Sequence, residues 1–154
     1  MSTTRGIVIA VLLGGFISGA VDITYALTVH GFRGIPPERI LKYIASGIWG
    51  REALEGDTSM AVAGGLLHFA MTTMMAAGFV IASRILPIML RYPLIVGPLY
   101  GLLMFGVMTH IVVPLSNANG GLPQGWLLVG ELLSHTLGVG LPIALVTRRF
   151  APIA

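Results

Sequence analysis

Four long runs of apolar residues alternate with short polar links along this chain of 154 residues. A bilayer core about 30 Å thick needs roughly 20 helical residues to cross it, and each run is at least that long. The runs predict membrane-spanning helices at residues 6–30, 58–83, 93–115 and 126–147. The pattern therefore predicts an all-α fold, an integral membrane four-helix bundle with up-down-up-down topology.

The first link carries an amphipathic pattern over residues 37–50, directly after Pro36. One side of this predicted helix is apolar and the other is charged; the apolar residues are Ile40, Leu41, Ile44 and Ile48, and the charged ones are Glu38, Arg39 and Lys42. Because the segment is too short to span, we expect an interfacial helix with Tyr43 and Trp49 at headgroup depth. Thr58 or Ser59 is expected to cap the second span.

The first run also begins like a secretory signal peptide. It has a basic start, an apolar stretch and a small-residue triplet, Ser18-Gly19-Ala20, of the kind found at cleavage sites. The apolar run continues beyond that triplet to Val29. We therefore interpret it as a retained span.

The composition supports one membrane domain over residues 1–154, with the lipid bilayer as its main partner. Hydrophobic residues make up 55% of the chain and charged residues 10%, and the mean hydropathy is +0.90, whereas soluble domains carry about 25% charged residues. The formal charge of +3 is too small to argue for nucleic acid. The chain has no cysteine, which excludes disulfides and thiolate metal ligands.

The distribution of basic residues predicts the orientation. Both termini and the second link carry arginines without acids, whereas the first link mixes basic and acidic residues. Because basic links stay on the cytoplasmic side, we expect the N- and C-termini to be cytoplasmic.

Ionisable residues inside the spans are the candidate functional residues, because such groups are costly in hydrocarbon. Five of them form the candidate polar-core site: Asp22, His68, His110, Glu131 and His135. Glu131 and His135 are four residues apart, so they share one helical face. His30 falls at the rim of the first span and is interpreted as a packing residue.

We expect these residues to lie near one another because their predicted depths in the membrane are similar. With a rise of about 1.5 Å per residue and alternating topology, Asp22, His68 and His135 lie roughly 12, 15 and 13 Å from the same membrane face. Glu131 and His110 are shallower, at roughly 6 to 8 Å. We therefore expect His135 and Glu131 at the centre of the site, with Asp22 and His68 as partners from other helices.

The residue types leave three functions open. A non-enzymatic protein that handles a proton, ion or small solute is favoured, because no nucleophile or cofactor motif is present. The second is a metal- or haem-dependent enzyme or electron carrier. The candidate ligands for a transition metal are His68, His135, Asp22 and Glu131. The two histidines are also a candidate pair of haem ligands. The third is a structural subunit whose polar residues lock helices together. A nucleophilic Ser134 beside His135 is disfavoured, because adjacent residues point about 100° apart on an α-helix.

Two small-xxx-small pairs mark faces where helices approach closely. They are Gly15 with Gly19 and Gly97 with Gly101. Either face suits internal packing or a homo-oligomer.

The last two-thirds of the chain resembles the YagU-like family of small uncharacterised bacterial inner-membrane proteins. The resemblance rests on His68 followed by the AAGF segment, His110 four residues before Pro114, Glu131 four residues before His135, and the closing Arg148-Arg149. It implies an integral protein of the bacterial inner (plasma) membrane. It supplies no substrate or catalytic residue, and it does not extend to Asp22 in the first span.

Overall fold

The structure is a computed structural model that describes residues 3–118, 120–121 and 123–152. These residues are almost entirely helical. In chain order the helices are α1 (Thr3–Gly31), α2 (Pro37–Trp49), α3 (Arg51–Glu55), α4 (Thr58–Ile85), α5 (Ile88–Arg91), α6 (Pro93–Val107), the π-helix η1 (Met108–Val112), α7 (Val113–Leu115), α8 (Trp126–Leu133), the π-helix η2 (Ser134–Gly140) and α9 (Leu141–Phe150). The all-α prediction is confirmed.

Four helical stretches are long and apolar enough to cross a membrane. They cover Thr4–Gly31, Thr58–Ile85, Pro93–Leu115 and Trp126–Phe150, so each predicted span is found with ends shifted by at most three residues. The third stretch joins α6, η1 and α7, and the fourth joins α8, η2 and α9. Most of their surface is apolar and unburied, as expected for helices that face lipid.

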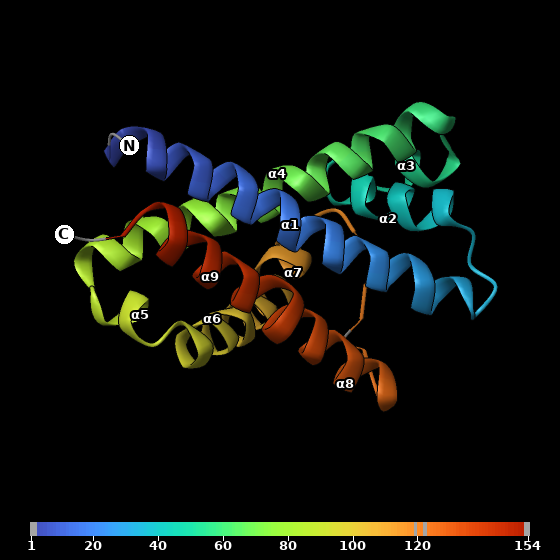
Figure 1. Ribbon diagram of the computed structural model, residues 1–154. Helices are drawn as coiled ribbons and strands as arrows, with labels where there is room; N and C mark the ends of the chain where they lie inside the picture. Colours follow the sequence, from blue (N-terminus) through green and yellow to red (C-terminus); the bar gives the residue numbers. More distant parts are fainter. Residues whose placement is uncertain (1–2, 119, 122, 153–154) are drawn as a thin grey trace.

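The helices form a bundle with alternating direction (Figure 1). Helix α1 packs between α4 on one side and α9 with η2 on the other, and α6 packs against η2 and α9. A buried group of Ala10, Val80 and Ala151 joins the start of α1 to the end of α4 and the end of the chain. Both termini and α5 therefore lie at one end of the bundle, and the first and third links lie at the other (Figure 1).

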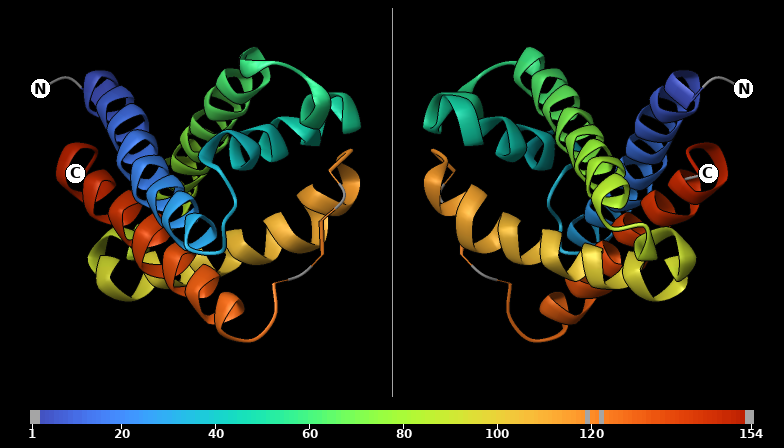
Figure 2. Two further views of the ribbon diagram at one scale, coloured as in Figure 1. Left: turned by 90° about the vertical axis from the view of Figure 1, so that its right-hand side faces the viewer. Right: turned by 90° about the vertical axis from the view of Figure 1, so that its left-hand side faces the viewer.

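The amphipathic helix of the first link is present, and its apolar side contacts protein. Helix α2 packs along the first half of α4 (Figure 2), with Ile40 and Ala45 buried. A Cβ on Gly64 would collide with the backbone carbonyl of Leu41, so the two helices touch through their main chains. The end of α2 is held by Asn117, whose side chain donates to the carbonyl of Ile48 over 2.8 Å.

The cap of α4 differs from the expectation of Thr58 or Ser59. The N-cap is Asp57, whose carboxylate accepts from the backbone N–H of Ser59 over 2.9 Å and also from the Ser59 hydroxyl. These hydrogen bonds favour the ionised carboxylate and hold the pKa of Asp57 below its usual range. Aspartate is as good an N-cap as serine or threonine. The sequence pattern alone therefore does not distinguish Asp57 from Thr58 or Ser59, and the predicted cap was wrong.

Both glycine pairs make contacts within the chain. Gly15 and Gly19 lie against α4, where added Cβ atoms would meet Thr73 and Thr72. Gly97 and Gly101 lie against the last span, where they would meet the backbone of Leu141 and His135. Self-association through these faces stays a prediction.

Candidate functional site

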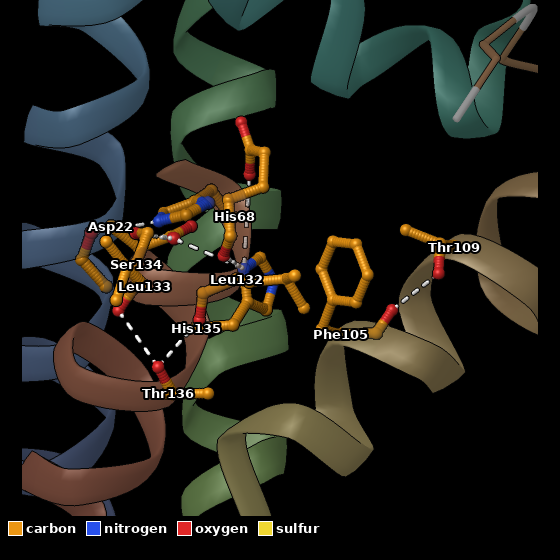
Figure 3. Close-up of polar contacts among 11 residues, drawn as sticks. Asp22, His68, Phe105, Thr109, Leu132, Leu133, Ser134, His135 and Thr136 are labelled. Carbon is orange, nitrogen blue, oxygen red and sulfur yellow. Dashed lines mark hydrogen bonds and ion pairs between the residues drawn. The ribbon is translucent and has the colours of Figure 1, made fainter. Parts of the chain in front are cut away.

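Helix α1 and the last span meet at Asp22. The Oγ hydroxyl of Ser134 donates a hydrogen bond of 2.6 Å to Oδ1 of Asp22, and Nδ1 of His135 lies 3.8 Å from the same oxygen (Figure 3). One carboxylate therefore receives two neighbouring side chains of η2. The contact lies well inside both helices, where water is not available to solvate a charge if they span a membrane.

The ring of His135 contacts three helices. Its Nδ1 is 3.1 Å from the backbone carbonyl of Glu131 and 4.0 Å from Oε2 of the same residue. Because a carbonyl only accepts, Nδ1 is the donor in this hydrogen bond. The other side of the ring meets Phe105 of α6 edge to face, with centroids 5.5 Å apart (Figure 3).

The two carboxylates have no fixed positive partner. The side chains of His135, Asp22 and Glu131 are only 14%, 17% and 22% exposed. The sequence places no lysine or arginine between Arg5 and Arg33 or between Arg91 and Arg148. Among the described ion pairs, each carboxylate therefore faces only the imidazole of His135, which carries charge only when it is protonated.

Tyr25 joins this group from α1. It stands three residues after Asp22 and thus on the same side of the helix. Its hydroxyl is buried against the backbone of Gly130 and has no hydrogen-bond partner in the described part of the chain. We call Asp22, Tyr25, Glu131, Ser134 and His135 the polar cluster. Tyr25 is not among the predicted site residues, although its spacing of three residues from Asp22 is a usable signal in the sequence.

The π-helix η2 brings Ser134 and His135 to one oxygen. On an α-helix, neighbouring residues diverge by about 100°, which disfavours a shared partner for Ser134 and His135. A π-helix has wider turns and often occurs at functional sites. Both π-helices end two residues before a proline, Pro114 after η1 and Pro142 after η2. Since proline removes one i→i−4 hydrogen bond, these prolines are the sequence signal for the irregular segments.

His68 lies one turn of α1 away from Asp22. It is buried, and its Nε2 donates to the backbone carbonyl of Gly19 over 2.9 Å. Its ring also meets Phe69 edge to face. His68 thus contacts the same helix as the polar cluster, but its hydrogen bond goes to the main chain.

The structure does not bring His110 to the polar cluster. Its side chain is exposed, and Nδ1 lies 3.1 Å from the carbonyl of Gly106 and 2.8 Å from the Thr109 hydroxyl, both on its own helix. His30 is at the end of α1, where Arg33 donates to its Nδ1 over 3.4 Å. Both histidines make only local contacts.

The described residues do not form a metal cage. Within residues 3–118, 120–121 and 123–152, no group of three or more histidine, aspartate or glutamate side chains is arranged to hold a metal ion. The four candidate ligands are divided between the polar cluster and the separate site of His68 on Gly19.

Comparison with known proteins adds no assignment. No protein-family model, no curated protein and no solved structure matches the chain. The function has to be argued from the polar cluster itself.

Proposed function

We propose that this chain is a multi-pass membrane protein, not an enzyme, whose polar cluster takes up and releases a proton as an ion or small solute passes. The proposal includes the location expected from the YagU-like resemblance, the bacterial inner membrane, with both termini cytoplasmic. Four helices of sufficient length and apolarity support the membrane part.

The observation that carries the proposal is a charge imbalance. Asp22 and Glu131 approach one imidazole from two helices. The sequence has no lysine or arginine between Arg5 and Arg33, or between Arg91 and Arg148, to neutralise them. Two uncompensated carboxylates in a hydrocarbon region are costly. The neutralising charge must therefore be mobile, either a proton on a carboxyl or imidazole group or a cation that replaces it. Histidine takes up protons near neutral pH, which suits repeated exchange.

Infrared spectroscopy of the purified protein in lipid tests the first half of the proposal. A carboxylic acid C=O band should disappear as pH rises, and Asp22→Asn or Glu131→Gln should remove part of it. The His30→Gln variant is the matched control, since His30 lies outside the cluster. The proposal fails if neither the carboxylates nor the imidazole of His135 carries an exchangeable proton at any pH at which the protein is folded.

Proteoliposomes with an entrapped pH indicator test the second half. An imposed pH gradient should collapse faster with wild-type protein than with empty vesicles, and screening alkali cations and small solutes should identify the species that accelerates it. The double variant Asp22→Asn/Glu131→Gln should behave like empty vesicles. Proton movement that is unchanged in this variant would assign the flux to leakage.

A structural lock is the second candidate function, because Ser134 donates directly to Asp22 across two helices. Asp22→Asn separates the two functions. Asparagine keeps the accepting oxygen and loses the titrating group, so a lock predicts near-wild-type stability and unchanged proton behaviour. Proton exchange predicts preserved stability with lost proton uptake.

The metal- or haem-dependent alternative has the weakest support, because the candidate ligands do not converge. Metal analysis and an absorption spectrum of the purified protein test it. A Soret band or stoichiometric zinc would favour this alternative over proton exchange.

A further inference from the structure

One end of the bundle carries basic side chains without acids. This end is formed by the start of α1, the end of α4, α5 and the end of α9. It holds five of the nine basic residues: Arg5, Arg84, Arg91, Arg148 and Arg149. The six acids of the chain are all elsewhere. Two belong to the polar cluster, and four lie in residues 38–57 at the other end. The segments at this end therefore contribute five basic side chains and no acidic one.

The opposite end is balanced. Residues 33–51 supply four basic side chains and residues 38–57 supply four acids. Two close pairs form within this set, Lys42 with Glu38 and Arg51 with Glu55, each at 2.7 Å. The hydrogen bond from Lys42 also holds the pKa of Glu38 below its usual range, so this carboxylate stays ionised. The surplus charge is thus confined to one end of the molecule.

The basic end also exposes apolar side chains in a link. Leu86 is 55% exposed and Ile88 is 53% exposed, next to Ile85 at the end of α4 and Tyr92 after α5. Met89 and Leu90 of the same link are buried against the bundle, so the link is held in place. Exposed apolar residues beside arginines are typical of a segment at the boundary between headgroups and acyl chains.

The arginines at this end have different partners. Arg84 donates to the carbonyls of Ala151 and Pro152, over 2.9 and 3.4 Å, and so holds the end of the chain against α4. Arg91 and Arg149 are exposed, and each guanidinium lies 5.5 Å from the ring centroid of the following aromatic residue, Tyr92 or Phe150. Arg148 is exposed as well. Arg91, Arg148 and Arg149 therefore have guanidinium groups at the surface that can contact a phosphate.

We propose that this end is a docking surface for the phosphate groups of anionic phospholipids, with Arg91, Arg148 and Arg149 as the main contacts. Guanidinium groups pair with phosphate oxygens through charge-assisted hydrogen bonds, and anionic lipids attract basic segments at membrane surfaces. The exposed Leu86 and Ile88 favour a lipid over a soluble phosphate or a nucleic acid, because their side chains gain from burial in acyl chains. The inference rests on the membrane embedding of the proposed function, and it is independent of proton exchange.

Thermal unfolding of the detergent-solubilised protein with added lipid tests this surface. Phosphatidylglycerol should raise the midpoint by about 5 °C more than the same amount of phosphatidylcholine, since a ligand that binds only the folded state stabilises it. The triple variant Arg91→Gln/Arg148→Gln/Arg149→Gln should lose this difference. The matched control Arg33→Gln/Arg39→Gln/Arg51→Gln removes three charges at the opposite end and should keep it. Arg84 is left unchanged because it holds the end of the chain.

A second measurement keeps the test independent of how well the variants fold. Raising the salt concentration to about 1 M shortens the Debye length to about 3 Å, so it should abolish the phosphatidylglycerol effect on wild-type protein. Equal stabilisation by both lipids, or equal loss in the triple variant and the control, would overturn the proposal. Inorganic phosphate that stabilises as well as the lipid would assign the surface to a soluble anion instead. Release of wild-type protein from membranes by alkaline carbonate would contradict membrane embedding itself, separately from lipid choice.

Discussion

The hydroxyl of Ser134 donates a hydrogen bond of 2.6 Å to Asp22, although the two residues are 112 positions apart in the sequence. This bond is shorter than the 3.8 Å between Asp22 and Nδ1 of His135. Asp22 therefore has a hydroxyl as its direct partner, and its second neighbour is an imidazole that carries charge only when it is protonated. Substitutions of Ser134 and His135 can therefore measure separately what each contact contributes to stability.

Double-mutant cycles on thermal stability should show coupling at both contacts. For Asp22→Ala with Ser134→Ala we expect a coupling energy on the order of 1 kcal/mol, as for hydrogen bonds between membrane helices. His135→Ala should destabilise the protein, and Asp22→Ala added to it should cost little more. Thr136→Ala is the control for the Asp22 cycle, because its hydroxyl bonds to the carbonyl of Leu132 in its own helix. Full additivity at both contacts would mean that the polar cluster is wrongly placed.

Replacing His68 should be more damaging than replacing His30. His68→Ala removes a buried ring and leaves the carbonyl of Gly19 without this donor, so a loss of about 1–3 kcal/mol is expected. His30→Ala should be nearly silent, because the ring contacts only Arg33 at the helix end. The measurement is the unfolding midpoint in detergent, and equal effects for the two variants would argue against the burial of His68.

Gly101 should tolerate no side chain. A Cβ at this position would collide with the carbonyl of His135 and lie 2.7 Å from Cα of Thr136, so Gly101→Ala should separate α6 from η2. Overpacking of this kind costs about 1–3 kcal/mol. Gly106→Ala is the matched control on the same helix, since an added Cβ there meets nothing within 4 Å. The measurement compares the unfolding midpoints of the two variants. Equal midpoints would contradict the close approach of α6 to η2 at Gly101.

Two adjacent glycines test the packing of α2 on α4. Gly64→Ala would push a methyl group into the carbonyl of Leu41, whereas Gly65→Ala would place it in open space. We expect the first to destabilise by about 1–3 kcal/mol and the second to be neutral or slightly stabilising, since alanine favours helix over glycine. Protease accessibility of the first link offers a second measurement. If α2 lies in the membrane interface without contacting α4, neither variant should change the stability of the protein.

Cysteine labelling can establish the sidedness, because the chain has no cysteine of its own. Single cysteines at the exposed positions Arg51 and Gln124 should react with an impermeant maleimide from one side of the membrane, and one at Arg91 from the other. The reason is that the first and third links lie at the end opposite α5 (Figure 1). Labelling of all three from the same side would rule out alternating topology.

The sequence by itself determined the helices and their levels. Apolar length set each predicted span, and the even rise of a helix predicted that Asp22, His68 and His135 lie at similar depths. Both quantities are local, because they follow from hydrophobic length and from 1.5 Å per residue along one helix. The amphipathic pattern of α2 was local in the same way.

Only the tertiary structure decided which side chains meet. The spans are apolar on almost every side, so their sequences do not encode how each helix is rotated about its axis. Ser134 and His135, both in the π-helix η2, lie near one carboxylate, and η2 packs against the backbone of Gly101 from a distant part of the sequence. Likewise, His110 points outward and α2 turns its apolar side to α4. Such choices arise from contacts between segments distant in sequence, which no local pattern contains.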